Sequence, residues 1–464
     1  MEKFSADIIV IGAGAAGMMA ASGAAQTISS RQASQAAGEE QQEGSGRVIV
    51  LEKMPRPGRK IMITGKGRCN FTNVKPWSEF SGHIHPKANF LKPSFFNLTP
   101  EKMTEYLQAN GMESVVERGD RAFPVSQSAA DVVDSLLRAA KKAGAEICCG
   151  KEVNAIEKTG DGKFGIRCSD GSVYDCRKLI ICTGGLSYPA TGSTGDGYGW
   201  ARQCGHSVSQ LFPSLTAIVP KGYKRESSEQ KEYDGSPWYE GTRGHIGRST
   251  PLSEAGSALC GNQLKNVSVT LIIDGNPAQT EFGDIDFTDG GIEGPVGFKI
   301  SRRCVKGIIN GSKAGISIDI KPAVSPEALS GRLMSLWEDI SKDRRSAGKP
   351  YKDRFRVLLG KVLPQQLIPA FVKCNPGLDH KTLAKTLKNW KFDIAGFVGY
   401  ERCVITAGGV SPEEFTAKTL ESKLVPGLYF AGEILDLDAD TGGYNLQTAF
   451  STGYLAGISA AKAL

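Results

Sequence analysis

The sequence predicts an α/β protein in which a Rossmann-like dinucleotide-binding domain is interrupted by a β-rich insert domain with a helical portion. A buried-type strand at Ala6–Ile11 leads into a glycine-rich turn and a helix, the arrangement that opens such a domain. The texture becomes polar and irregular in the middle of the chain, and buried strands with glycine turns return toward the C-terminus. We therefore expect the dinucleotide-binding domain at 1–205 and 392–464, and the insert at 206–391.

The turn after the first strand carries the motif G-x-G-x-x-G, and a helix is predicted from Met18 to about Thr27. The first glycine permits the tight turn, the second lets backbone N–H groups approach a pyrophosphate, and the third lets the helix pack on the sheet. The helix N-terminus adds a partial positive charge. A glycine turn used only for packing is the alternative. The residues expected to bind the dinucleotide here are Gly12, Gly14, Ala15, Ala16 and Gly17.

A second strand at Arg47–Leu51 ends in Glu52, which is followed by Lys53. An acid at this place binds ribose hydroxyls in dinucleotide-binding folds, so we expect Glu52 and Lys53 at the cofactor. The acid comes later than the usual distance of about 20 residues after the motif. The polar stretch Gln26–Gly46, interpreted as a surface excursion, accounts for the excess.

Residues 55 to 205 are expected to complete the first part of the domain. Amphipathic helices are predicted at Pro100–Asn110 and Ser128–Ala143, a meander at Glu146–Lys158, Phe164–Cys168 and Ser172–Tyr174, and a buried strand at Lys178–Cys182. That strand leads into Thr183, Gly184 and Gly185, which should face the cofactor.

The insert carries strand patterns and helix patterns in separate parts. Strands are predicted at Val267–Ile273, Ile285–Phe287 and Ile316–Ile320, and helices at Pro326–Ile340, Lys352–Leu359 and Lys381–Asn389. The stretch Lys221–Ser257 is polar and is interpreted as loop-rich.

The C-terminal part supplies a second set of cofactor contacts. Strand Leu428–Ala431 precedes Gly432 and Glu433, and Thr441–Gln447 opens the last helix. Gly432 would allow close approach, and Glu433 could accept a hydrogen bond from a ribityl hydroxyl. The free N–H groups at the helix start would face the N1–C2=O edge of a flavin, which becomes negative on reduction. An ordinary capped helix is the alternative.

Four blocks of sequence resemble the bacterial flavoproteins grouped with aminoacetone oxidase and the BaiN-like reductases. These blocks are Gly12–Gly17, Arg59–Asn73 (RKIMITGKGRCNFTN), Thr406–Val410 (TAGGV) and Gly427–Gln447 (GLYFAGEILDLDADTGGYNLQ). The resemblance runs along nearly the whole chain. It implies a Rossmann-like FAD-binding domain of the FAD/NAD(P)-binding fold, interrupted by an insert domain, and an NAD(P)/FAD-dependent oxidoreductase.

Two polar stretches, 26–46 and 221–257, depart from this family without touching its motifs. The second lies in the insert, so the substrate of the family transfers to this chain less safely than its cofactor-binding motifs do.

The resemblance implies further cofactor-binding residues. Arg59–Asn73 becomes a flavin-side loop in which Lys60, Arg68 and Asn70 offer donors, with surface solvation as the alternative for the two cations. Cys69 is either structural or a redox-sensitive thiol near the flavin. The full set implied is Arg59, Lys60, Thr64, Gly65, Gly67, Arg68, Cys69, Asn70, Val153 (through its backbone, at the adenine), Gly408, Gly409, Gly443, Tyr444, Asn445, Leu446 and Gln447.

No nucleophile triad, paired-carboxylate signature or metal box is evident in the sequence. The acidic run Asp436, Asp438 and Asp440 lacks the remainder of an EF-hand pattern, and His83–His85 is interpreted as a loop feature. We therefore expect no metal and a reaction carried by the flavin itself, with Tyr444 and Arg68 as candidate catalytic side chains.

The composition limits the partners. Lys and Arg number 56 and Asp and Glu 49, a net charge of +7 without a clean basic run, so a nucleic-acid partner is not favoured. The eleven cysteines form no C-x-x-C pair. The apolar stretch Ile8–Ala21 is too short to span a bilayer, and Met1–Asp7 lacks the apolar region of a secretory signal. A cytoplasmic protein without a membrane partner is expected; no oligomeric state is predicted.

The predicted function is an FAD-dependent oxidoreductase that transfers a hydride or two electrons between bound FAD and a small organic substrate. No second G-x-G-x-x-G follows a strand, which leaves NAD(P)H as a candidate electron partner only. The alternatives are an oxidase of small amines that releases hydrogen peroxide, a tRNA-modifying flavoprotein, and an electron carrier without catalysis.

Overall fold

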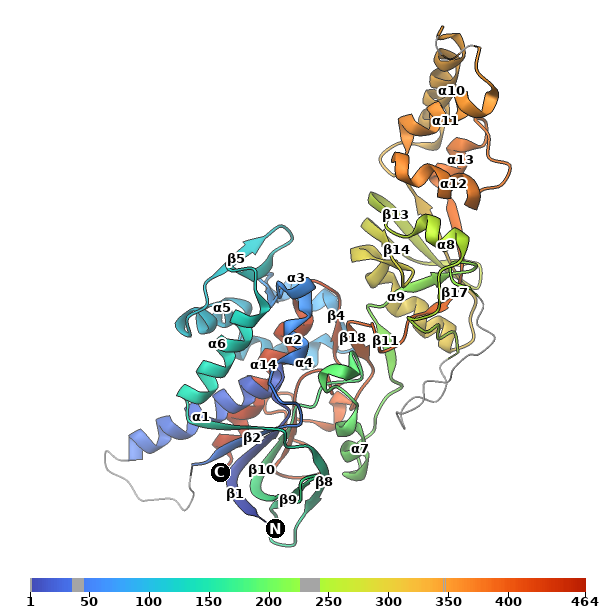
Figure 1. Ribbon diagram of the computed structural model, residues 1–464. Helices are drawn as coiled ribbons and strands as arrows, with labels where there is room; N and C mark the ends of the chain where they lie inside the picture. Colours follow the sequence, from blue (N-terminus) through green and yellow to red (C-terminus); the bar gives the residue numbers. More distant parts are fainter. Residues whose placement is uncertain (1, 36–45, 226–242, 345, 347) are drawn as a thin grey trace. The chain divides into compact units, whose positions relative to one another are not determined.

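The chain folds into two compact units in a computed structural model (Figure 1). Unit 1 comprises Met1–Phe212 with Ile405–Leu464, and unit 2 comprises Pro213–Val404. The structure describes residues 2–35, 46–225, 243–344, 346 and 348–464.

A seven-stranded sheet forms the centre of unit 1, in the order β7-β2-β1-β10-β9-β8, with β19 also paired to β10. Strands β7, β2, β1, β10 and β19 are parallel, and β8, β9 and the first half of β10 form an antiparallel meander. This arrangement confirms the predicted Rossmann-like α/β fold. The strands are β1 (Lys3–Ile11), β2 (Val48–Glu52), β7 (Ala145–Cys149), β8 (Val153–Lys158), β9 (Phe164–Cys168), β10 (Val173–Ile181) and β19 (Leu428–Phe430).

The strand boundaries around the meander differ from those predicted. Glu146–Lys158 is two strands, because Gly150 turns the chain with φ +72° between β7 and β8. Ser172–Tyr174 and Lys178–Cys182 belong to the single strand β10. The first helix, α1, runs over Ala15–Gln35 and so continues past Thr27 into the stretch expected to be a surface excursion. Residues 36–45 of that stretch lie outside the described residues.

The remaining helices and strands of unit 1 lie before, between and after the sheet strands in the sequence. The helices are α2 (Arg59–Met62), α3 (Trp77–Phe80), α4 (Ala88–Asn97), α5 (Pro100–Ala109), α6 (Ala129–Lys142), α7 (Asp196–Gln203) and α14 (Tyr444–Lys462). The strands are β3 (Thr72–Asn73), β4 (Ile84–His85), β5 (Ser114–Glu117), β6 (Arg121–Pro124), β18 (Ile405–Ala407) and β20 (Asp438–Ala439), and β11 (Phe212–Ser214) lies where the chain leaves the unit.

Helices α1 and α14 contact each other backbone to backbone. A Cβ built on Gly453 would lie 2.1 Å from the carbonyl oxygen of Ala16, and one on Gly457 would lie 2.0 Å from that of Ala20. Both helices contribute buried alanines to one hydrophobic cluster with sheet residues such as Ile8. Small residues are therefore what lets the two ends of the chain pack this closely.

Unit 2 is a closed β-barrel with a helical excursion. The barrel order is β12-β15-β14-β13-β16-β17. Its strands are β12 (Ile218–Pro220), β13 (Gln263–Ile273), β14 (Asn276–Phe287), β15 (Ile292–Glu293), β16 (Ala314–Asp319) and β17 (Trp390–Phe397), with helices α8 (Glu254–Leu259) and α9 (Gly294–Ile309).

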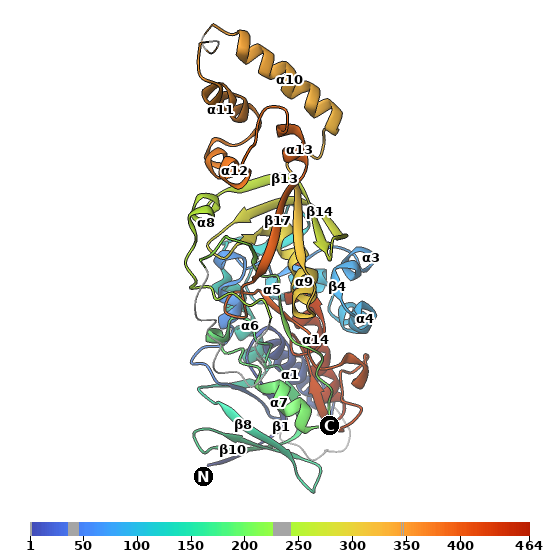
Figure 2. The same ribbon diagram turned by 90° about the vertical axis from the view of Figure 1, so that its right-hand side faces the viewer.

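Four helices are inserted between β16 and β17. They are α10 (Pro326–Lys342), α11 (Tyr351–Val362), α12 (Ile368–Cys374) and α13 (Leu383–Lys388), and they gather at one end of the barrel (Figure 2). Together with the barrel they confirm a β-rich insert with a helical portion. Because β17 pairs with β12 and β16, the insert extends past the predicted boundary at 391 and ends at Val404.

None of the described helices has both the length and the apolar character needed to cross a bilayer.

Gly453→Ala tests the contact between the two helices. The added methyl group would meet a backbone carbonyl, so the helices must separate, and we expect unfolding to become easier by about 1–3 kcal/mol. Chemical denaturation measures this change. Gly160→Ala is the control, since its Cβ would meet nothing within 4 Å, and it should stay within about 0.5 kcal/mol of the wild type. Equal effects of the two substitutions would contradict the packing argument.

Candidate functional site

The carboxyl ends of four parallel strands meet at one edge of the sheet. The Gly12 N–H donates to the Leu51 carbonyl at 2.8 Å, and the Cys182 N–H donates to the Ile11 carbonyl at 2.8 Å. The Ala431 N–H donates to the Ile181 carbonyl at 3.1 Å. The turns that follow β1, β2, β10 and β19 therefore lie together, at the edge where doubly wound sheets bind their ligands.

The first glycine turn leaves an open cradle. Gly12 has φ +97°, and a Cβ there would lie 2.6 Å from the Cys182 carbonyl oxygen. A Cβ on Gly17 would lie 1.8 Å from the Gly12 carbonyl oxygen. At Gly14, in contrast, a Cβ would meet nothing within 4 Å. The open space lies at the first turn of α1, where helical N–H groups have no partner within the helix, and it fits a pyrophosphate.

Glu52 ties the first turn to the meander. Its carboxylate accepts hydrogen bonds from the N–H groups of Ala13 at 2.7 Å and Met54 at 2.8 Å. Its carbonyl accepts one from Lys151 at 2.9 Å, which brings the start of β8, and with it the buried Val153, to this side of the site. Binding of the adenosine end by Glu52 and Val153 stays a prediction. The neighbouring Lys53 forms an ion pair with Asp196 at 2.7 Å and also donates to Thr194. The structure gives both side chains protein partners.

A single carboxylate joins the loops at the other end of the site. Glu433, after β19, accepts hydrogen bonds from the Thr406 N–H at 2.9 Å and the Ser187 hydroxyl at 2.7 Å. It also forms an ion pair with Lys60, whose ammonium donates to Ser187 at 2.6 Å. A Cβ on Gly185 would lie 2.5 Å from the Thr406 hydroxyl oxygen. The structure thus brings together the predicted Lys60, Gly185 and Glu433. The sequence did not single out the Ser187 and Thr406 side chains, because isolated hydroxyls carry no pattern.

The start of α14 lies against the Arg59–Asn73 loop. Gly443 has φ +97°, and a Cβ there would lie 2.4 Å from the Thr72 backbone and 2.9 Å from the Asn70 side-chain oxygen. That Asn70 oxygen is buried and has no hydrogen-bond partner among the described residues; the same holds for the Thr183 hydroxyl. Buried polar atoms are rarely left unpaired, and these two are free to bond a ligand in the site. The glycine cradle and these two atoms fit a dinucleotide.

Two polar side chains of α14 serve the fold instead of a ligand. Gln447 accepts a hydrogen bond from the Thr72 hydroxyl at 2.6 Å and donates to the Leu98 carbonyl at 2.9 Å. Asn445 accepts from the Ala439 N–H and donates to its carbonyl, both at 2.8 Å. Leu446 packs on a hydrophobic cluster. What this turn can offer a flavin is therefore its backbone N–H groups.

Other predicted glycines let strands and loops approach closely. Gly408 has φ +82° and Gly409 φ +148°, and Cβ atoms there would lie 2.1 Å from the Gln210 carbonyl oxygen and 2.6 Å from that of Ile434. A Cβ on Gly184, φ +74°, would lie 3.1 Å from the Ser193 hydroxyl, and one on Gly432, φ +83°, 2.7 Å from Ala16.

The Arg59–Asn73 loop is tightly wound. Gly65 and Gly67 have φ +57° and +87°, and the Thr64 hydroxyl donates to the Ile61 carbonyl at 2.6 Å. Cys69 is fully buried in a hydrophobic cluster, and burial raises the pKa of its thiol to about 12 against a smaller opposing hydrogen bond from Thr64. A protonated, inaccessible thiol fits the structural interpretation and gives no support to the redox one.

The predicted cations of this loop have protein partners. Arg68 forms an ion pair with Glu117, donates to Gln127, and lies over the Phe123 ring at 4.3 Å. Arg59 donates to the Ala190 carbonyl at 3.4 Å. A role for Arg68 in catalysis stays a prediction.

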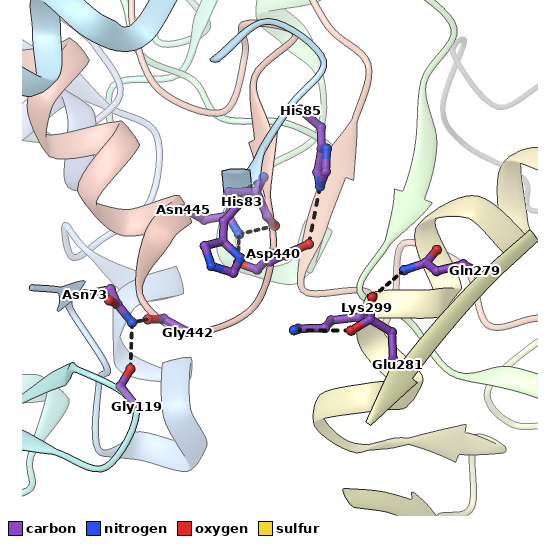
Figure 3. Close-up of polar contacts among 11 residues, drawn as sticks. Asn73, His83, His85, Gly119, Gln279, Glu281, Lys299, Asp440, Gly442 and Asn445 are labelled. Atoms are coloured by element: carbon purple, nitrogen blue, oxygen red, sulfur yellow. Dashed lines mark hydrogen bonds and ion pairs between the residues drawn. The ribbon is translucent and has the colours of Figure 1, made fainter. Parts of the chain in front are cut away.

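A cluster of two histidines and an aspartate lies beside the start of α14 (Figure 3). The Asp440 carboxylate accepts hydrogen bonds from His83 Nδ1 at 2.9 Å and His85 Nε2 at 3.3 Å. The Tyr444 ring stacks on His83 with 4.2 Å between centroids. Burial disfavours the charged form of Asp440, but the two imidazole hydrogen bonds outweigh it and lower the pKa of its carboxyl below the usual range.

Sequence reasoning missed this cluster, because its aspartate lies more than 350 residues from its two histidines. Within the part of the chain that the structure describes, no group of three or more His, Cys, Asp or Glu side chains is arranged to hold a metal ion.

A known protein family matches almost the whole chain. The model described as "HI0933-like protein Rossmann domain" matches residues 6–459. The chain belongs to this family. The match confirms the resemblance indicated by the glycine motif and by the RCNFTN and GGYNLQ blocks. Together with the similarity to the reductase described below, it shows that the chain is an FAD-dependent oxidoreductase.

Two curated relatives are similar over their full length. The 3-dehydro-bile acid delta(4,6)-reductase of Clostridium scindens is 28% identical, with 98% of each chain covered. The ribosomal RNA dihydrouridine synthase of Escherichia coli is 29% identical, with 98% of this chain and 97% of that protein covered. A solved 3-ketosteroid-delta4-(5alpha)-dehydrogenase from Rhodococcus jostii RHA1 is 15% identical, with a TM-score of 0.43, over 99% of this chain and 98% of that one.

Gly14→Glu tests the placement of the pyrophosphate. The carboxylate would enter the open cradle and repel the phosphates, so we expect purified protein to lose FAD, with at most about one tenth of the wild-type absorbance at 450 nm after desalting. Because a Cβ at this position would meet nothing within 4 Å, the circular dichroism spectrum should not change. FAD retained at wild-type occupancy would refute the placement.

Proposed function

We propose that this chain is an FAD-dependent reductase that saturates a carbon–carbon double bond conjugated to a carbonyl group, with NAD(P)H as the electron source. The names of the two curated relatives support this proposal because they describe one chemistry. A delta(4,6)-reductase of a 3-dehydro bile acid removes double bonds conjugated to a 3-oxo group. Formation of dihydrouridine removes the C5=C6 bond conjugated to the C4 carbonyl of uracil.

The start of α14 is the observation that carries the proposal. Bound FAD would supply the hydride. The backbone N–H groups that begin the helix would hold the N1–C2=O edge of the ring. Their partial positive charge favours the reduced, negatively charged ring, which is the form that donates a hydride.

The chain's other residues would bind and position the coenzyme. Gly14 and the first turn of α1 would hold the pyrophosphate, and Glu52 the ribose of the adenosine. The Glu433 network would fix the loops around the ring, with its carboxylate toward the ribityl chain. The substrate proposed first is a small organic molecule with a conjugated carbonyl.

A second candidate substrate is a uracil base in ribosomal RNA, and the charge of the helical segment favours it. We define the helical segment as residues 320–389, which contain α10–α13. It holds 14 Lys and Arg against six Asp and Glu, a net charge of +8, whereas the whole chain carries +7. The positive charge is therefore concentrated here, although no single run of the sequence displays it.

Many of these cations are available to a polyanion. Eight are exposed and form no ion pair with any described residue: Arg332, Arg344, Lys349, Lys352, Arg356, Lys361, Lys381 and Lys385. Exposed Tyr351 lies among them and could stack on a base. Clustered cations with an aromatic are typical of nucleic-acid surfaces.

Anaerobic half-reactions test the reductase. We expect NADH or NADPH to bleach the FAD absorbance, and a steroid 4-en-3-one, or RNA containing uridine, to restore it without oxygen. Stopped-flow absorbance at 450 nm measures both steps, and a saturated 3-oxo steroid is the control that should leave the flavin reduced. Reduction only by small amines, with hydrogen peroxide formed when oxygen returns, would show the oxidase instead.

Charge reversal in the helical segment tests the RNA candidate. The pair Lys352→Glu and Arg356→Glu should weaken binding of a fluorescent ribosomal RNA fragment at least about tenfold and flatten its salt dependence, because phosphate contacts are lost. The matched control is Lys92→Glu with Lys102→Glu, two exposed lysines of unit 1. Fluorescence anisotropy measures both, and equal losses in the two pairs would point to nonspecific attraction and remove this candidate.

A further inference from the structure

The cluster of His83, His85 and Asp440 has no part in the cofactor contacts described above. Its side chains remain partly accessible: 26% of His83, 33% of His85 and 19% of Asp440 is exposed. Two imidazoles that share one carboxylate and still reach solvent are equipped to move protons.

The backbone holds this cluster in place. Strand β4, which contains His85, pairs with β20, and the Asp440 N–H donates to the His83 carbonyl at 3.0 Å. The Asn445 side chain bonds both backbone groups of Ala439 and the Asp440 carbonyl (Figure 3). Because the loop is bonded on both sides, the orientation of the carboxylate is fixed.

The protonation pattern follows from the carboxylate. Asp440 is ionised at neutral pH, since its pKa is lowered, and an ionised carboxylate only accepts hydrogen bonds. His83 therefore donates through Nδ1, and its Nε2 is the atom left to exchange a proton with another molecule. His85 donates through Nε2 to the second oxygen.

His83 lies beside the first residue of α14. Its ring stacks on that of Tyr444, the first residue of α14, with 22° between the planes. Tyr444 begins the helix whose first turn would hold the flavin edge, so the stacking places His83 beside that turn. Tyr444 is buried and also packs edge-on against Phe80, so its ring holds the His83 ring in position by packing.

We propose that His83, positioned by Asp440, is the proton donor of the reduction, and that His85 holds the second oxygen of the same carboxylate. This inference rests on the proposed function. Bound FAD, when reduced, would supply a hydride with its two electrons to the carbon β to the carbonyl, and the double bond would become single. The α carbon would take the proton from His83 Nε2, and His83 would regain a proton from water.

The groups that face this cluster define its pH dependence. Burial raises the pKa of the Tyr444 phenol to about 12, opposed by Lys75 and increased further by Asp440, Asp120 and Glu79. The phenol therefore stays protonated through neutral pH.

His83→Gln tests the donor, because the amide keeps a hydrogen-bonding side chain that cannot supply a proton. We expect FAD retention and flavin reduction by NAD(P)H to match the wild type, and reoxidation by the conjugated substrate to slow by about 100-fold or more. Reoxidation by ferricyanide, which needs no proton on carbon, should be unchanged. Asp440→Asn should slow the same step and move its pH profile. His380→Gln, in the helical segment, is the control.

A loss of FAD, or an equal slowing of both half-reactions, would assign His83 a structural role and overturn the proposal. A second measurement does not depend on the substrate. With only five histidines in the chain, NMR of ¹⁵N-histidine-labelled holoprotein can follow His83 directly. Its titration should move to higher pH when the flavin is reduced anaerobically, because the ring becomes negative. An unchanged titration would overturn the role of His83, whether or not a conjugated substrate reacts. Failure of every conjugated substrate to react would instead remove the proposed function.

Discussion

The contact between α1 and α14 is the constraint on which the rest of unit 1 depends. Gly453 and Gly457 let the last helix lie against the carbonyls of Ala16 and Ala20. Because α14 is in van der Waals contact with α1 along its length, the position of its N-terminus is fixed as well. The glycine turn that begins α1 and the Gly443 turn that begins α14 are thereby set at one edge of the sheet, although some 430 residues separate them in the chain.

Polar contacts then position the loops between these two turns. Glu433 gathers the segments after β10, β18 and β19 together with Lys60, while Glu52 holds the first turn to the start of β8. Each carboxylate stabilises several backbone segments at once, so the site is a property of the whole unit. This explains why its residues come from nearly every part of the sequence except the insert.

What the sequence predicts well is local. Gly12–Gly17 specifies its turn through steric demands on single residues, and the buried strands follow from their own composition. What it predicts poorly depends on distant partners. Nothing near Cys69 indicates that its thiol is buried, and nothing in Gln447 indicates that its amide binds the Leu98 carbonyl. The pairing of His83 with Asp440 exists only once β4 and β20 align. The basic character of residues 320–389 is likewise a sum over separate helices and shows in no single motif.

The two substrate classes suggested by the relatives need not require two kinds of active site. In a conjugated carbonyl compound the β carbon accepts a hydride because the developing charge spreads onto oxygen, and this holds for an enone and for a uracil ring alike. In the proposed reaction, hydride delivery and protonation would both be tasks of unit 1, through the coenzyme and His83. Discrimination between a small molecule and an RNA falls to surfaces that bind the remainder of the substrate, where phosphate charge is the largest difference. The positive charge is concentrated in the helical segment, which contains none of the predicted coenzyme-binding motifs. This placement is consistent with one part of the chain carrying out the reaction and another selecting the substrate.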